Sequence, residues 1–284
     1  MSDNKDFNWR RNITRFIITL VLMIYTVITL FPMLWSIYSS VKSSNEILTS
    51  PWGLPNKLNF QNYINAFTKA NMGDYFLNSI FITVLSLTLL LVLAIPTSYV
   101  LARFKFMFSK TLKNIFVAGL FIQVMIYLVP LFLLVNKVHL LNNRLVLCVI
   151  YAVTSLPFTI FLLISFMKSI PKDYEDAAMI DGCNYFGILV KIIVPMVKPA
   201  VVTVSIFSAL GFWNEFPLAF TFISSSSKKT LSVGLANLME IQRYATDWGA
   251  LFAGLAIVMI PTLLFYVFTQ KKLTEGVSIG GLKG

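Results

Sequence analysis

The chain has 284 residues, of which 57% are hydrophobic and only 12% are charged, about half the charged fraction of an average soluble domain. A soluble protein of this length needs polar residues to cover its surface, so the composition excludes an ordinary soluble enzyme and indicates a protein that lies in a lipid bilayer. The formal net charge is +11, but the basic residues lie between long apolar segments, so they indicate membrane topology and not a nucleic-acid partner.

Six uncharged or nearly uncharged segments are long enough to cross a membrane. A helix needs about 20 apolar residues to span a hydrocarbon core of about 30 Å. A segment in lipid must also satisfy its backbone hydrogen bonds internally, and these segments are too long for barrel strands, so each predicts a helix. In chain order they are residues 16–41, 77–102, 114–136, 145–167, 199–222 and 248–270. The expected fold is an all-α integral membrane protein with six transmembrane helices.

The basic residues between these segments predict the orientation of the chain. Fifteen Lys and Arg residues lie on the side that holds both termini, and eight lie on the other side. By the positive-inside rule, we expect both termini to be cytoplasmic. We interpret the first apolar segment as a retained span and not as a secretory signal, because it continues without the small-residue cleavage site that a signal requires.

The sequence lacks the residues that most enzymes need. It contains two cysteines and a single histidine, His139, so we expect neither a disulfide framework nor a metal site. No Walker A pattern occurs, because the glycine-rich C-terminal tail lacks the order Gly-Lys-Ser/Thr. We therefore expect that this chain is not an enzyme, binds no cofactor, and does not hydrolyse ATP by itself.

Glu215 is the ionisable residue that interrupts the fifth apolar segment, directly after Trp213 and Asn214. Burying a carboxylate in a membrane costs at least a few kcal/mol unless it faces water or a partner, so Glu215 is a candidate functional residue. The alternatives are that Glu215 reaches the external interface or caps a broken helix. The near absence of other ionisable groups within the spans disfavours a secondary carrier or a channel.

The connection between the fourth and fifth spans, residues 171–195, is too patterned for a disordered loop. A short helix over residues 174–179 would carry acidic residues in its first turn and end near Gly182. A second amphipathic helix over residues 185–194 would stop at Pro195. We expect two short helices that are bent at a glycine and face the cytoplasm.

This connection resembles the hallmark of the permease subunits of binding-protein-dependent ABC importers, E-A-A-x3-G-x9-I-x-L-P. The matching residues are Asp176, Ala177, Ala178, Gly182, Ile192, Val194 and Pro195. Asp176 replaces Glu and Val194 replaces Leu, while Glu175 directly before Asp176 is a second candidate for the acidic contact. The alternative is an amphipathic helix that lies on the bilayer surface.

The resemblance implies a type I ABC importer transmembrane domain over residues 77–272, with coupling helices at about 171–195. Residues 1–15 would form a cytoplasmic N-terminus, 16–76 the first span and an external segment, and 273–284 a cytoplasmic tail. It assigns ATPase coupling to Glu175, Asp176, Ala177, Ala178, Asp181, Gly182, Ile192 and Pro195. It also implies that a tail made of Gly281, Leu282, Lys283 and Gly284 contacts the ATPase.

The partners implied by the resemblance are a second homologous permease, two ATPase subunits that use ATP and Mg, an external substrate-binding protein and membrane lipid. The expected location is the bacterial plasma (inner) membrane, which the chain would cross several times.

Four further segments resemble the carbohydrate-uptake branch, specifically the smaller permease of the maltose-importer type: residues 58–67, 76–79, 211–216 and 280–284. In this branch Trp213, Asn214 and Glu215 would line the translocation path, since aromatic faces and hydrogen-bonding groups suit a sugar. The external loop 224–247 would contact the binding protein, or would be a flexible solvated loop. The alternatives for the whole chain are an ABC permease for another substrate, such as glycerol-phosphate, and a self-sufficient secondary carrier or channel.

Overall fold

The computed structural model describes residues 3–68, 71–242 and 247–281. All regular secondary structure in these residues is helical. The chain forms two compact units, which are described separately: Met1–Ala70 with Leu238–Ile257, and Asn71–Asn237 with Val258–Gly284.

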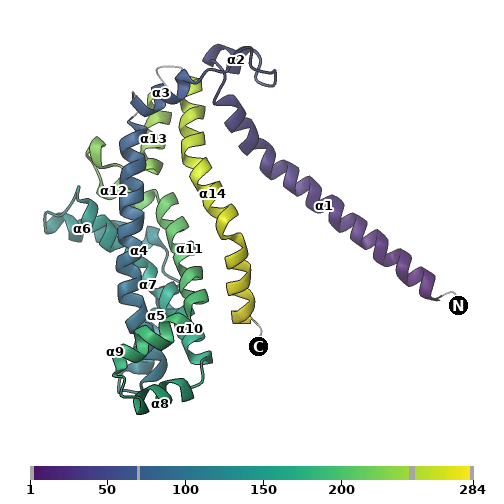
Figure 1. The fold of residues 1–284 in the computed structure, drawn as a ribbon. Helices are drawn as coiled ribbons and strands as arrows, with labels where there is room; N and C mark the ends of the chain where they lie inside the picture. The colour runs from purple at the N-terminus through teal and green to yellow at the C-terminus, as the bar shows by residue number, and fades with distance from the viewer. Residues whose placement is uncertain (1–2, 69–70, 243–246, 282–284) are drawn as a thin grey trace. The chain divides into compact units, whose positions relative to one another are not determined.

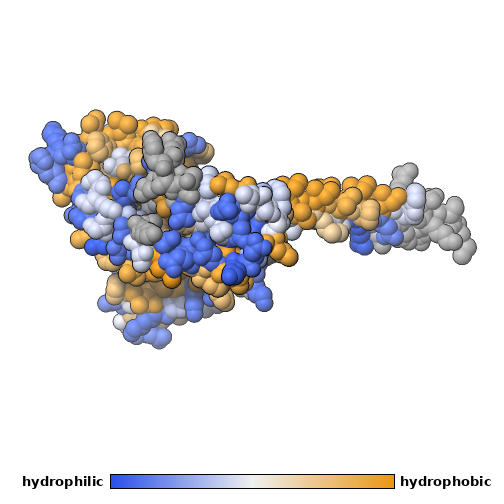
Figure 2. Space-filling model, turned by 90° about the horizontal axis from the view of Figure 1, so that it is seen from above, coloured by the Kyte–Doolittle hydropathy of each residue, from blue (hydrophilic) through white to orange (hydrophobic). Residues whose placement is uncertain are grey.

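The first unit begins with α1 (Asp3–Ser39), which contains the first predicted span. Its exposed side chains are mainly hydrophobic along most of its length (Figure 2), as lipid contact requires. The short helices α2 (Ser44–Thr49) and α3 (Gln61–Thr68) follow. A capping box starts α2: the Glu46 N–H donates to the Ser43 hydroxyl, and the Ser43 N–H donates to the Glu46 carboxylate. The Asn56 N–H donates to the other oxygen of the same carboxylate. These bonds lower the pKa of Glu46 from its ordinary value.

The second unit is built around α4 (Met72–Arg103), α7 (Arg144–Ser169) and α11 (Lys198–Asn214). Figure 1 shows α4 and α7 side by side, and their buried apolar residues form one core with those of α11. Leu90, Leu147, Leu163 and Val204 are among the residues of this core, and each is fully buried. Side chains on the outer faces are also apolar, as expected for helices that contact lipid.

Four helices are long and apolar enough to cross a membrane, and the number rises to six if each of two bent helix pairs is one span. The third predicted span is such a pair, because α5 (Ser109–Gly119) and α6 (Val124–Lys137) meet at 105°. The predicted continuous helix is therefore wrong here. Tight hydrogen bonds from the N–H groups of residues 120–122 to the carbonyl groups three residues earlier end α5.

The fifth predicted span is also interrupted. Its helix α11 ends at Asn214, Glu215 is extended, and α12 (Pro217–Phe222) begins at a proline. Pro217 has no N–H to donate to the carbonyl group four residues earlier, and its ring clashes with that carbonyl in a continuous helix, which is consistent with the break. The segment that follows α12 contains the 3₁₀ turn Ser226–Lys228 and α13 (Leu231–Gln242), and α14 (Trp248–Gly281) contains the sixth predicted span.

The connection between α7 and α11 contains the short helices that the sequence predicts. The first is α8 (Asp173–Ile180), and Gly182 after it has a φ of 80°, a conformation that glycine adopts without strain. The prediction that the next helix stops at Pro195 is wrong. This helix continues through α9 (Tyr185–Ile188), a π-helical turn (Leu189–Ile193) and α10 (Val194–Met196). The wider π turn accommodates Pro195, and a 77° bend follows before Lys198.

Candidate functional site: the coupling segment and a membrane cavity

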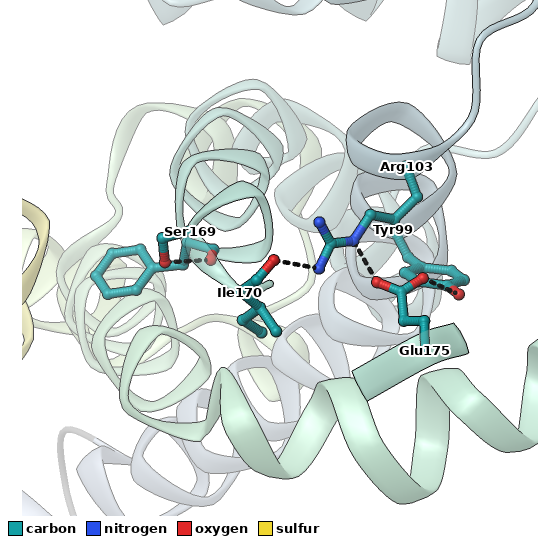
Figure 3. Close-up of polar contacts among 6 residues, drawn as sticks. Tyr99, Arg103, Ser169, Ile170 and Glu175 are labelled. Atoms are coloured by element: carbon teal, nitrogen blue, oxygen red, sulfur yellow. Dashed lines mark hydrogen bonds and ion pairs between the residues drawn. The ribbon is translucent and has the colours of Figure 1, made fainter. Parts of the chain in front are cut away.

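The segment from α8 to α10, residues 173–196, is called the coupling segment below, and a buried ion pair attaches it to the end of α4 (Figure 3). The Arg103 Nε atom lies 2.5 Å from the Glu175 Oε1 atom, and the two side chains are only 6% and 8% exposed. The Tyr99 hydroxyl donates to the other Glu175 oxygen at 3.0 Å. Because Tyr99 and Arg103 are four residues apart on α4, both side chains lie on the same face of that helix.

Arg103 also contacts the end of α7. Its Nη2 atom donates to the Ile170 carbonyl oxygen at 2.9 Å (Figure 3). One guanidinium group therefore joins the C-terminal ends of α4 and α7 to α8. We call Tyr99, Arg103 and Glu175 the clamp.

Apolar packing surrounds the clamp. The Phe104 ring makes edge contacts with the Tyr99 ring and the Tyr185 ring, at centroid distances of 5.8 and 5.2 Å. Ala178 and Ile188 of the coupling segment are buried in the same cluster. The inner face of the coupling segment is thus fixed to the helices by both an ion pair and a small apolar core.

The structure divides the predicted coupling residues between two faces. Glu175 and Ala178 are buried, and Ile192 is half-buried, whereas Asp176, Ala177, Asp181, Gly182 and Pro195 are exposed. The sequence prediction treated Glu175 as an alternative acidic contact for the ATPase, but its carboxylate points inward to Arg103. In the sequence, Arg103 is only one of the basic residues that indicate topology, and Tyr99 belongs to no motif. Their i, i+4 spacing was the signal that both face one side of α4.

Large apolar side chains are also exposed on the coupling segment. Ile180 is 87% exposed and Phe186 is 73% exposed, and Tyr174 and Tyr185 are more than half exposed. Exposed apolar residues that lie together, with acidic residues beside them, are typical of a surface that binds a partner. The predicted tail contact cannot be placed in the same way: Gly281 ends the backbone of α14, and Leu282, Lys283 and Gly284 lie outside the described residues.

Glu215 lies at the break between α11 and α12 and caps the N-terminus of α12. Its carboxylate accepts hydrogen bonds from the Leu218 N–H at 2.6 Å and the Ala219 N–H at 2.9 Å. The Tyr151 hydroxyl of α7 donates a third bond at 2.5 Å, and the Tyr151 ring stacks on the Phe212 ring at 5.4 Å. Of the alternatives for Glu215, the structure supports the cap of a broken helix.

Glu215 also lines a cavity of about 450 Å³. Its walls come from the α5–α6 bend, α7 and the α11–α12 break. The other two residues predicted for the translocation path lie elsewhere. Trp213 lines a separate cavity with Thr83 and Pro261, and the Asn214 side chain is exposed and donates to the Leu210 carbonyl oxygen. The three consecutive residues therefore do not share one site.

The serine-rich run in the predicted external loop is hydrogen-bonded to the start of α4 and to the turn before α7. The Tyr75 hydroxyl pairs with the Ser226 hydroxyl, and the Asn78 amide donates to the carbonyl oxygens of Ser227 and Lys229. Asn142 exchanges two hydrogen bonds with Ser225. These contacts differ from those of a flexible solvated loop.

Comparisons with known proteins agree with this architecture. A family model described as the binding-protein-dependent transport system inner membrane component matches residues 94–277. The diacetylchitobiose uptake system permease protein NgcG of Streptomyces coelicolor is 40% identical over 260 residues, which cover 92% of this chain and 86% of that protein. The sulfoquinovosyl glycerol transport system permease protein SmoH of Agrobacterium fabrum is 34% identical over 257 residues, covering 90% of this chain and 89% of that protein.

A solved structure has the same fold. It is a crystal structure of a bacterial ABC transporter involved in the import of the acidic polysaccharide alginate, with a TM-score of 0.81 and 23% identity over 92% of this chain and 96% of that chain. The family match and the two relatives, together with the apolar helices and the coupling segment, show that the chain belongs to the family of binding-protein-dependent transport system inner membrane components.

Proposed function

We propose that this chain is a permease subunit of an ATP-driven importer that moves a sugar or oligosaccharide from an external binding protein into the cytoplasm. Relatives that align over about nine-tenths of this chain are permeases for diacetylchitobiose, sulfoquinovosyl glycerol and arabinooligosaccharides, which supports a sugar over glycerol-phosphate. An alginate transporter with a similar chain has been crystallised with a pentasaccharide-bound periplasmic protein, which supports delivery by a binding protein.

The partners in this proposal are a second homologous permease, two ATPase subunits that use ATP and Mg, and the binding protein. The chain itself holds no cofactor and catalyses no reaction. ATP-driven closure of the two ATPase subunits would move the coupling segment, and this movement would open the pathway alternately to the two sides of the membrane.

The observation that carries the proposal is the two-faced coupling segment. Its inner face is clamped to α4 and α7 through Glu175, and its outer face presents Asp176, Ile180 and Phe186. A segment that transmits force needs a rigid attachment on one side and a partner on the other. A helix lying on the bilayer would instead place Asp176 and Asp181 next to lipid headgroups, which disfavours that alternative.

The primary test is ATP-dependent uptake by the complete importer. The chain, its partner permease, the ATPase and candidate binding proteins would be reconstituted into liposomes and supplied with diacetylchitobiose, arabinooligosaccharides, malto-oligosaccharides and glycerol-phosphate. We expect uptake of one sugar that requires both ATP and a binding protein. Uptake by the chain alone without ATP, or uptake of glycerol-phosphate only, would overturn the proposal.

Two neighbouring acidic residues give a matched test of the coupling segment. Asp176→Arg changes the exposed face, and we expect loss of ATPase co-purification while the chain remains inserted in the membrane. Glu175→Gln leaves Arg103 without its buried partner, and breaking a buried pair typically costs about 3–5 kcal/mol. We expect this variant to retain the ATPase but to transport less sugar per ATP hydrolysed.

A double-mutant cycle distinguishes the clamp from a general loss of folding. The cycle compares Arg103→Met, Glu175→Met and the variant that carries both changes. The double variant removes both buried charges, so we expect it to transport more sugar per ATP hydrolysed than either single variant. Equal effects of Asp176→Arg and Glu175→Gln on ATPase co-purification, with no difference in the coupling ratio, would contradict the assignment of the two faces.

A further inference from the structure

The connection between α4 and α5 is a short segment that leaves one membrane helix and enters another. It comprises residues 104–108, between the end of α4 and the start of α5. The Phe104 ring faces inward and contacts the Tyr99 and Tyr185 rings. The four side chains that follow are all exposed. Because the ring contacts fix Phe104, the connection holds these next four side chains on the outside of the protein.

Large apolar side chains are exposed on this connection and on the first turns of α5. Met107 is 85% exposed and Phe108 is 58% exposed. Phe108, Leu112 and Ile115 are spaced by four and three residues, so they share one side of the start of α5, and all three are exposed. An apolar helical face with lysines beside it is typical of a segment that lies at a membrane surface.

Four lysines accompany these apolar side chains: Lys105, Lys110, Lys113 and Lys168. Lys113 is half-buried where α5 packs against α7, and Lys168 near the end of α7 is close enough to repel its charge. None of the four forms an ion pair within the described residues, and the sequence holds no Asp or Glu from residue 75 to residue 172. Like charges held together without an acid are stabilised by an anion from outside.

The combination of charged and apolar groups selects the ligand. A free phosphate would use the lysines but would leave Met107 and Phe108 in water, and a neutral lipid would leave the lysines without a counter-charge. An acidic surface of an ATPase subunit would suit the lysines, but Leu112 and Ile115 lie on a helix that is half of a candidate membrane span. An anionic phospholipid matches both kinds of group, because it carries a phosphate and acyl chains in one molecule.

We propose that residues 105–113, together with Lys168, bind the headgroup of an anionic phospholipid. The lysines would contact the phosphate, and Met107 and Phe108 would lie among the acyl chains. In the orientation that the basic residues predict, this lipid belongs to the cytoplasmic leaflet. The site directly follows Arg103, so a bound lipid would hold the end of α4 beside the coupling segment.

The experiment measures lipid binding at this position in the complete importer, reconstituted into phosphatidylcholine nanodiscs. A phosphatidylglycerol with a photoreactive headgroup would be added, and its attachment to peptides from residues 104–119 would be quantified by mass spectrometry. We expect unlabelled phosphatidylglycerol to compete for this attachment. Additional phosphatidylcholine and inorganic phosphate should not compete, because each offers only one of the two kinds of contact.

Exposed lysines give matched variants for this measurement. Each lysine near an anionic membrane surface changes binding by about fivefold, so we expect Lys105→Gln/Lys110→Gln to bind phosphatidylglycerol roughly 30-fold more weakly. Lys105→Arg/Lys110→Arg keeps both charges and should bind as wild type. The control Lys57→Gln/Lys137→Gln removes two exposed lysines on the other predicted side of the membrane and should also bind as wild type.

Several outcomes would overturn the inference. One is competition by inorganic phosphate or phosphatidylcholine that is as strong as competition by phosphatidylglycerol. Another is wild-type affinity in Lys105→Gln/Lys110→Gln, or an equal loss in the Lys57→Gln/Lys137→Gln control. Loss of the ATPase from Lys105→Gln/Lys110→Gln with unchanged lipid binding would assign the surface to the ATPase. The uptake panel tests sugar import separately, so the lipid site can fail while the proposed function stands.

Discussion

At the scale of single residues, the role of each acidic residue in the coupling segment depends on the face of α8 on which it lies. Glu175 and Asp176 are adjacent, and successive residues of a helix point about 100° apart. The first therefore points into the protein toward Arg103, and the second points outward. Two residues with the same charge and neighbouring positions consequently have different roles in our proposal.

Gly182 is a second residue whose role depends on its conformation. Its φ is 80°, and a Cβ atom there would meet nothing within 4 Å. A left-handed conformation costs about 1–2 kcal/mol for most residues and less for Asn. We expect Gly182→Ala to reduce uptake, Gly182→Asn to retain more of it, and Gly182→Trp to abolish it by adding bulk to the exposed face.

The measurement is ATP-dependent sugar uptake, with ATPase co-purification from the same membranes. Gly182→Asn tests the backbone requirement, because it restores the conformational preference without restoring the small size. If Gly182→Trp imports sugar at the wild-type rate, the coupling segment does not bind the ATPase at this glycine.

At the scale of secondary-structure elements, α4 carries polar contacts at both ends within the second unit. Near its start, Asn78 binds the serine-rich run and Arg144, and the Ser79 hydroxyl accepts from the Leu231 N–H. At its end, Arg103 binds the coupling segment. A movement of the coupling segment would therefore act on a helix whose far end is hydrogen-bonded to the predicted external loop.

The contact between α4 and α13 gives a prediction for this element. Gly234 of α13 is buried, and a Cβ atom there would overlap the ring of Tyr75. We expect Gly234→Ala to lower the thermal unfolding midpoint of the purified importer, because overpacking costs about 1–3 kcal/mol. Combining Gly234→Ala with Tyr75→Ala should cost less than the sum of the two single changes.

Differential scanning measurements on the four proteins of this cycle would provide the test. If the changes in unfolding midpoint of the two single variants add up to that of the double variant, Gly234 and Tyr75 are not in steric contact. The close approach of α13 to α4 would then be incorrect.

At the scale of the whole molecule, the orientation in the membrane is a prediction from the positive-inside rule. It places the coupling segment in the cytoplasm, and the chain has a natural reporter there. Cys183 lies in the coupling segment and is half-buried, whereas Cys148 is fully buried within α7. We expect a membrane-impermeant maleimide to label the chain in inside-out vesicles and not in right-side-out vesicles.

Two variants complete that measurement. Cys183→Ser should remove the labelling, and Cys148→Ser should leave it unchanged. Addition of the ATPase should slow the reaction of Cys183 if the coupling segment is its docking site. Labelling in right-side-out vesicles only would show that Cys183 lies outside the cell and that the predicted orientation is wrong.

The sequence by itself determined the environment, the helical class and the approximate positions of the apolar segments. These follow from composition and segment length, which need no knowledge of neighbours, because lipid forces each segment to satisfy its own backbone. The motif from Asp176 to Pro195 likewise determined the family and located the coupling segment. Local chemistry also predicted the turn at Gly182, because glycine tolerates the left-handed conformation that ends α8.

Only the tertiary structure decided where helices break and which side chains meet. The bend after Gly119 lies in a segment whose hydropathy suits a continuous span. At the break at Glu215, the carboxylate accepts a hydrogen bond from Tyr151, a residue distant in sequence. The clamp joins Glu175 to residues more than 70 positions earlier. Composition and periodicity report the average environment of a segment, whereas hydrogen-bond partners depend on packing between segments, which no local pattern contains.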